Sequence, residues 1–384
     1  MTTNLTIRDS KRTRSLVPDD RMAATDEILE TLSQLLQPGM GVLAADESTG
    51  TIERRFAAVG VRSTPETRRA YRELLFTAPG IGEHISGVIL HDETIRDRAR
   101  DGTPFPELLR RRGAVPGVKV DLGAKPLAFA PDESVTEGLD GLRERLQQYK
   151  ALGARFTKWR AVLKIGPRIP SEYCLAVNAH ALARFAALSQ EAGLVPIVEP
   201  EVLMDGDHSL DRAYEVTLMA QRAVVAELND QHVALEHILL KPNMVLPGRD
   251  SPGKSSVSEV ASATLRCLRG AVPPAVPGIV FLSGGQTPEQ ATAHLQAMNV
   301  TGAQPWVLSF SFARALQDPA LTIWAGDPSN VRAAQITFER RARMNGLAQL
   351  GQSDGETDPG GAPRTRQVQD RKGHRVEMPG PPRG

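Results

Sequence analysis

Short apolar runs rich in β-branched residues alternate along the chain with longer segments in which apolar residues recur every three or four positions. The short runs are typical of buried strands, and the longer period is typical of amphipathic helices. The runs that predict strands are residues 41–46, 85–90, 116–121, 155–162, 194–202, 237–244, 277–284 and 305–312. The segments that predict helices are residues 26–36, 65–75, 136–149, 179–191, 210–229, 256–269 and 288–298.

Eight strands alternating with helices, after a leading helix, predict an α/β fold of the (β/α)8 TIM-barrel type, with one domain over residues 24–350. The competing architecture is a doubly wound open sheet, but no G-x-G-x-x-G motif follows an early strand to favour dinucleotide binding. Residues 1–23 are polar without periodicity, and residues 351–384 are rich in Gly, Pro and charge. We therefore expect both terminal segments to be flexible.

The composition excludes several classes of function. Hydrophobic residues make up 41% of the chain and charged residues 24%, which fits a packed core and a soluble surface. The formal charge is only +1, so no overall field attracts nucleic acid or an anionic membrane. Cys174 and Cys267 are too few for a disulfide framework, and neither a secretory signal nor a run of 18 apolar residues is present. We expect a cytoplasmic protein that binds neither nucleic acid nor membranes.

Ionisable residues gather late in the predicted strands, where TIM barrels place their active sites. They are Asp46 in the first strand, Lys119 and Asp121 in the third, Lys158 and Arg160 in the fourth, Glu199 and Glu201 in the fifth, and Lys241 in the sixth. Residues two apart on a strand share a face, and buried charge is costly unless it is paired. We interpret the group as one functional site rather than as separate structural ion pairs.

Lys241 ends an apolar strand, in 239-LLKPN-243. Loss of solvation and repulsion from Lys158 would favour a partly neutral amine near pH 7, able to attack a ketone and form an iminium. A carboxylate that takes a proton from a nearby substrate hydroxyl would complete a retro-aldol cleavage, and either Glu199 or Asp46 could supply it. The eight histidines are dispersed and form no ligand pattern, so we predict no metal.

Two turns near the end of the predicted barrel are suited to phosphate. The segments 281-FLSGGQT-287 and 309-SFSFARAL-316 combine small residues with a following helix, after the two strands where barrels often bind phosphate. Arg314 adds a guanidinium, and Arg55 could serve a second anion across the barrel mouth. These features favour a bisphosphate substrate.

Several motifs in order resemble class I fructose-bisphosphate aldolases, over residues 25–348. They are 44-AADEST-49, 117-GVKVD-121, 157-TKWR-160, 195-VPIVEPE-201, 240-LKPNM-244, 281-FLSGGQ-286 and 311-SFARALQ-317. The resemblance implies a lyase of glycolysis and gluconeogenesis that needs no metal or cofactor. Such an enzyme cleaves fructose 1,6-bisphosphate reversibly through a lysine Schiff base, so its partners are phosphorylated ketose and triose substrates. The family expectation is a homotetramer.

Matched motif by motif, the resemblance also implies roles for individual residues. Lys241 would be the Schiff-base lysine, Glu199 the acid/base and Lys158 its partner in proton transfer, while Asp46 would orient this partner and a substrate hydroxyl. The residues that match substrate-binding positions are Lys119, Arg160, Glu201, Ser48, Arg55, Ser283, Gly284, Ser311 and Arg314.

One departure from the family pattern is Ala313, which stands where glycine is common beside the phosphate. Its Cβ would disturb the pocket if the backbone there needed a positive φ. Two other functions stay open from the sequence. They are a transaldolase-like Schiff-base transferase and a catalytically silent aldolase-like scaffold.

Overall fold

The structure, a computed structural model, describes residues 19–353 of the chain. Within that range eight parallel strands close into a barrel in the order β1-β10-β9-β8-β7-β6-β3-β2. Their bounds are β1 (Gly41–Ala45), β2 (Ile85–Leu90), β3 (Val115–Lys119), β6 (Phe156–Leu163), β7 (Val195–Val202), β8 (Leu239–Leu240), β9 (Gly278–Phe281) and β10 (Val307–Phe312). The predicted TIM barrel is confirmed. The terminal segments expected to be flexible lie mostly outside the described residues.

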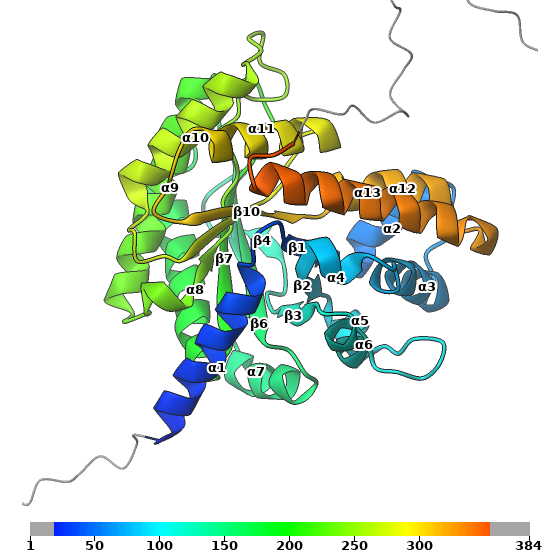
Figure 1. Cartoon of the computed structure of the whole chain (residues 1–384). Coiled ribbons are helices and arrows are strands. Elements are labelled where there is room, and N and C mark those ends of the chain that lie inside the picture. The colour runs from blue at the N-terminus through cyan, green and yellow to red at the C-terminus, as the bar shows by residue number, and fades with distance from the viewer. Residues whose placement is uncertain (1–18, 354–384) are drawn as a thin grey trace, which may run out of the picture. The chain divides into compact units, whose positions relative to one another are not determined.

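Helices surround the barrel strands (Figure 1). The longer ones are α1 (Asp19–Leu35), α2 (Thr49–Ala57), α3 (Pro65–Phe76), α7 (Leu142–Ala151), α8 (Glu172–Glu191), α9 (Leu210–Asp230), α10 (Val257–Ala271), α11 (Pro288–Val300), α12 (Arg314–Trp324) and α13 (Val331–Gln349). Short helical segments are α4 (Ile81–His84), α5 (Asp92–Arg96), α6 (Phe105–Arg111), η1 (Leu235–His237) and η2 (Pro328–Asn330).

Three predicted helices begin elsewhere in the structure. Helix α1 starts at Asp19 instead of residue 26, and α8 starts at Glu172 instead of residue 179. The side chain of Ser171 caps α8 by accepting a hydrogen bond from the Cys174 N–H. The helix expected over residues 136–149 begins only at Leu142. The residues before it form an antiparallel hairpin that was not predicted, β4 (Ala124–Pro126) with β5 (Ser134–Thr136).

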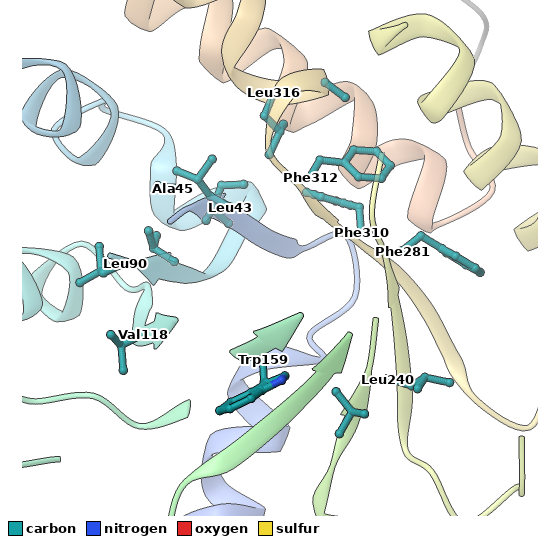
Figure 2. Close-up of a cluster of buried hydrophobic side chains, with 14 of the residues drawn as sticks. Leu43, Ala45, Leu90, Val118, Trp159, Leu240, Phe281, Phe310, Phe312 and Leu316 are labelled. Carbon is teal, nitrogen blue, oxygen red and sulfur yellow. The ribbon is translucent and has the colours of Figure 1, made fainter. Parts of the chain in front are cut away.

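Side chains on the barrel strands alternate between the interior and the surrounding helices, as the period of two requires. The outward set packs with the helices in one large apolar cluster. Figure 2 shows part of it, from Leu43 and Ala45 on β1 round to Phe310 and Phe312 on β10, with Leu316 of α12 beside them. This cluster anchors the strands from outside and leaves their inward positions free for chemistry.

The half of the barrel interior nearer the amino ends of the strands is apolar and tightly packed. Inward side chains such as Val42, Phe156 and Leu239 form a second apolar cluster. Leu32 and Leu35 of α1 belong to the same cluster. Gly117 is needed for this packing, because a Cβ on it would lie 2.4 Å from the Phe156 ring. With the base of the barrel filled, polar side chains can project into the interior only nearer the carboxyl ends of the strands.

Candidate active site

Four charged side chains fill the part of the barrel interior nearer the carboxyl ends of the strands. Asp46 continues the inward register of Val42 on β1, and Lys158 that of Phe156 on β6. The inward register likewise places Glu199 on β7 and Lys241 directly after β8. Each of the four is at most 8% exposed. The four residues predicted to be catalytic are therefore brought together from four different strands.

These four groups form a continuous chain of ion pairs. Nζ of Lys158 lies 2.5 Å from Oδ2 of Asp46 and 3.1 Å from Oε2 of Glu199. Nζ of Lys241 lies 3.1 Å from Oε1 of Glu199. The Glu199 carboxylate thus bridges the two lysines. The residues alone predicted repulsion between Lys158 and Lys241, and the family resemblance implied that Lys158 assists Glu199. The structure places the Glu199 carboxylate between the two lysines.

The pairing determines the ionisation of three of the four groups. Burial alone would raise the pKa of Asp46 and of Glu199, but Lys158 and Lys241 outweigh it and hold both pKa values below the ordinary range. Burial alone would lower the pKa of Lys158, and Asp46 and Glu199 together raise it instead. Both carboxylates are therefore ionised and Lys158 is charged at neutral pH, so the site holds a fixed positive centre between two bases.

A second layer of charge lies beside this chain. Nζ of Lys119 lies 2.5 Å from Oδ1 of Asp121, and the other Asp121 oxygen accepts a hydrogen bond from the Arg160 backbone N–H at 3.2 Å. The Arg160 guanidinium pairs with Glu201, and its side chain is 41% exposed. The predicted residues Lys119, Arg160 and Glu201 therefore border the chain of four charged side chains, with Arg160 accessible to solvent.

The turn after β9 and the end of β10 hold the residues predicted to bind phosphate. Gly284 has a φ of 55°, a left-handed conformation that glycine adopts without strain, and its carbonyl accepts a hydrogen bond from the Arg314 guanidinium. Ser283 and Ser311 are buried, and the Ser311 hydroxyl has no protein partner. These four residues come from two adjacent strand ends, which is the arrangement that a phosphate site here requires.

The concern raised by Ala313 is resolved. This residue precedes α12 with a φ of −103°, so its backbone is not left-handed. A Cβ therefore introduces no positive-φ strain. The disturbance of the phosphate turn was expected only for a positive φ, so the structure gives no reason to expect it.

Ser48 and Arg55 lie on the segment that follows β1. Ser48 is exposed at the start of α2, where its hydroxyl donates to Thr51 Oγ1 at 3.1 Å. Arg55 is bound on two sides, to Glu47 and, at 2.6 Å, to Oδ1 of Asp318. The structure thus brings Arg55 to the β1 end of the barrel, but its guanidinium is engaged in ion pairs there.

Glu47 is a structural residue of the site that sequence reasoning missed. Its carboxylate binds Arg55, lies 2.6 Å from the Arg72 guanidinium and accepts a hydrogen bond from Gln317 Nε2 at 3.0 Å. Burial would raise the pKa of Glu47, but Arg72 and Arg55 outweigh burial and lower it. Glu47 follows Asp46 directly, so this cluster fixes the segment that carries Asp46. The adjacent acidic pair was a signal, but nothing in the sequence identified Arg72 as its buried partner.

Among residues 19–353 no group of three or more His, Cys, Asp or Glu residues is placed to hold a metal ion. In the same range no helix combines the length and the apolar character needed to cross a membrane.

Comparison with known proteins gives a consistent result. The family model described as fructose-bisphosphate aldolase class-I matches residues 27–372. A probable fructose-bisphosphate aldolase class 1 from Xanthomonas campestris pv. campestris is 54% identical over 332 residues, which cover 86% of this chain and 99% of that protein. The cytosolic fructose-bisphosphate aldolase 5 of Arabidopsis thaliana is 53% identical over 331 residues, covering 86% and 92%.

A solved structure extends the likeness to three dimensions. Fructose-bisphosphate aldolase from Plasmodium falciparum, crystallised with TRAP and a small-molecule inhibitor, superposes with a TM-score of 0.85 at 43% identity. The match covers 88% of this chain and 96% of that one. The barrel, the four-residue charge chain and these comparisons together show that the chain belongs to the class I fructose-bisphosphate aldolase family.

Proposed function

We propose that the chain cleaves fructose 1,6-bisphosphate reversibly to dihydroxyacetone phosphate and glyceraldehyde 3-phosphate through a Schiff base on Lys241. The observation that carries the proposal is the Glu199 carboxylate, which lies 3.1 Å from Nζ of both Lys241 and Lys158. A nucleophilic amine, a proton acceptor and a fixed positive charge are thus adjacent at the carboxyl end of the barrel strands.

The first half of the reaction forms the iminium. Lys241 transfers a proton to Glu199 and its neutral amine attacks carbon 2 of the ketose, giving a carbinolamine. Glu199 then returns a proton to the departing hydroxyl, which leaves as water. Lys158 remains charged throughout, because Asp46 and Glu199 raise its pKa, and it stabilises Glu199 each time that group becomes a carboxylate.

The second half breaks the bond between carbons 3 and 4. Glu199 accepts the proton of the carbon 4 hydroxyl, the electron pair of the breaking bond moves to the iminium, and glyceraldehyde 3-phosphate leaves. The resulting enamine is protonated at carbon 3, and addition of water releases dihydroxyacetone phosphate from Lys241. Asp46 lies 2.5 Å from Nζ of Lys158 and orients it. We assign the base role to Glu199 because this carboxylate contacts the Schiff-base lysine.

The remaining predicted residues bind the two ends of the substrate in this proposal. Ser283, Gly284, Ser311 and Arg314 form one phosphate site after β9 and β10. Ser48 and Arg55 form the other beside β1, and occupation of that site requires the phosphate to compete with Asp318 for the Arg55 guanidinium. Lys119, Arg160 and Glu201 contact the hydroxyl groups between the phosphates.

Three wider expectations are part of the proposal. The reaction needs no metal or other cofactor, which is supported by membership of class I and by a catalytic group with two lysines. A cytoplasmic location is supported by the names of the Arabidopsis thaliana and Pisum sativum relatives. The homotetramer rests on the family resemblance, and sedimentation of the purified protein tests it.

The experiment that tests this function is product analysis with fructose 1,6-bisphosphate as the only sugar, with and without exhaustive chelation. We expect equimolar triose phosphates and the same rate in both samples. A requirement for an aldose acceptor would identify a transaldolase-like transferase, and absence of turnover would identify a silent scaffold. Loss of activity that zinc restores would contradict the Schiff-base mechanism.

A further inference from the structure

The proposed mechanism leaves one buried imidazole without a role. His294 lies on α11, is 5% exposed, and places Nδ1 2.5 Å from Oε1 of Gln286. Gln286 is itself buried, and its Nε2 donates to the Ser283 carbonyl at 3.0 Å and contacts Sδ of Met244 at 3.6 Å. A chain of polar contacts therefore runs from the helix to the turn proposed to bind phosphate.

The chemistry of this chain fixes where its hydrogen atoms lie. The Ser283 carbonyl can only accept, so Gln286 must present its amide nitrogen to it and its amide oxygen to His294. Nδ1 of His294 must then carry a hydrogen and donate. Burial lowers the pKa of His294 to about 4, so the ring is neutral near pH 7 and keeps this donor.

The consequence for the turn follows from the planarity of the peptide bond. The Ser283 carbonyl is held twice, by the Gln286 side chain at 3.0 Å and by the Gln286 backbone N–H at 3.2 Å. In a trans peptide the C=O and the next N–H point in opposite directions. Holding the Ser283 carbonyl toward Gln286 therefore directs the Gly284 N–H away from it. The next peptide is held independently, by Arg314 at the Gly284 carbonyl.

We propose that His294 is a positioning residue for phosphate recognition, acting through Gln286 to fix the Ser283–Gly284 peptide with its N–H toward the substrate phosphate. The inference rests on the proposed function, which assigns this turn to phosphate. His294 does not touch the substrate. It prevents the Gln286 amide group from rotating. Such a rotation would place the amide oxygen against the Ser283 carbonyl, and the hydrogen bond that holds the Ser283–Gly284 peptide would be lost.

Two substitutions at one position separate this role from simple core packing. His294→Leu keeps an apolar side chain but removes the donor. His294→Asn is smaller still, yet it places Nδ2 on the same branch as the imidazole Nδ1. If the hydrogen bond matters, His294→Leu raises KM for fructose 1,6-bisphosphate about tenfold, as expected for one buried acceptor left unpaired, while kcat stays within about twofold. His294→Asn then restores KM to within about threefold of the wild type.

The probe for the turn itself is inorganic phosphate as a competitive inhibitor. Its inhibition constant should rise in His294→Leu in parallel with KM and recover in His294→Asn. A packing role predicts the opposite order, with the smaller asparagine at least as harmful as leucine. That outcome, or a fall in kcat with KM unchanged, would overturn the proposal.

A double-mutant cycle with Gln286→Met tests whether the effect passes through Gln286. Methionine has a similar shape to glutamine without its amide. In the Gln286→Met background, His294→Leu should change KM by less than about twofold, whereas additive effects would contradict the relay. Cleavage by the wild-type protein is measured first, so a failure of the proposed function is seen before any variant is compared.

Discussion

The carboxylate of Glu199 lies 3.1 Å from the amino group of Lys241. This contact joins the group that must lose a proton to the group that can take it, before any substrate is present. Burial would raise the pKa of Glu199, but the neighbouring lysines outweigh burial and lower it. This carboxylate is therefore ionised in the resting site and ready to accept a proton. The mechanism therefore predicts that Glu199 controls the rate more than the affinity.

Replacing Glu199 by Gln tests that prediction. The amide keeps the shape of the side chain but cannot accept the Lys241 proton, so kcat should fall by about 10² to 10⁴ while KM changes little. Steady-state cleavage of fructose 1,6-bisphosphate measures both. Glu201→Gln on the same strand is the matched control and should affect KM more than kcat. A loss in kcat of less than about tenfold for Glu199→Gln would place the base elsewhere.

The Glu47 cluster should be important for stability. Glu47→Gln leaves the buried Arg72 and Arg55 guanidinium groups short of a counterion, a change that typically costs about 3–5 kcal/mol. Chemical denaturation of the variant measures the difference. Glu191→Gln is the control, because both partners of its ion pair with Arg143 are 58% exposed, so that the pair should contribute little to stability. Equal losses in the two variants would contradict the assignment.

The same cluster predicts a pH dependence. The pKa of Glu47 is lower in the folded state than the ordinary value of 4.5 for this side chain. Its contribution to stability is therefore present above pH 4.5 and is lost as the pH falls through the lowered pKa. The stability difference between the wild type and Glu47→Gln should therefore be constant at neutral pH and shrink in acid. A difference that stayed constant down to pH 2 would show that the charge of Glu47 is not its cause.

Asp97 should behave in the opposite way. Burial, followed by repulsion from Glu93, raises its pKa from 3.8 to about 6. An acid with a raised folded pKa destabilises the protein once it is ionised, so the penalty is absent below about pH 4 and complete above about pH 6. Asp97→Asn should raise Tm at pH 8 and leave it unchanged at pH 3.5. Thermal melts at both pH values test this. A lower Tm for Asp97→Asn than for the wild type at pH 8 would show that the ionised Asp97 stabilises the fold, which contradicts the prediction.

Phosphate recognition by Arg314 can be separated from catalysis by comparing substrates. Arg314→Ala should raise KM for fructose 1,6-bisphosphate by about 10- to 100-fold, since a charge-assisted contact is lost. One of the two fructose monophosphates lacks the phosphate that Arg314 binds, and its KM should be unaffected. Arg212→Ala, at an exposed position on α9, controls for a general loss of positive charge. Equal increases for all three substrates would count against a direct contact.

The strands and the group of four buried charged residues could be predicted from the sequence because one physical pattern determines both. On the four strands that supply this group, apolar residues such as Phe156 occupy the first inward positions, and a charge such as Lys158 follows at a later inward position. Since alternation fixes the face, reading the strand was sufficient to place the charge. The same reasoning located Glu199 and Lys241 without any knowledge of the contacts between them.

The parts that could not be predicted contain buried polar groups. Helix α13 was missed because Arg341 and Asn345 occupy buried positions that an apolar period would reserve for hydrophobic residues. The first turns of α8 were missed for a similar reason, since Asn178 is buried among them and donates to the Ser134 carbonyl. Pairing across long sequence separations, such as Glu47 with Arg72, leaves no local signal.

The most direct test of the account is reduction with borohydride in the presence of dihydroxyacetone phosphate, followed by peptide mapping. We predict one triose adduct per chain, attached to Lys241, and a Lys241→Met variant that traps none and loses at least about 10³-fold in cleavage rate. An adduct on Lys158 or Lys119, or a Lys241→Met variant that retains substantial activity, would contradict the assignment of Lys241 as the nucleophile.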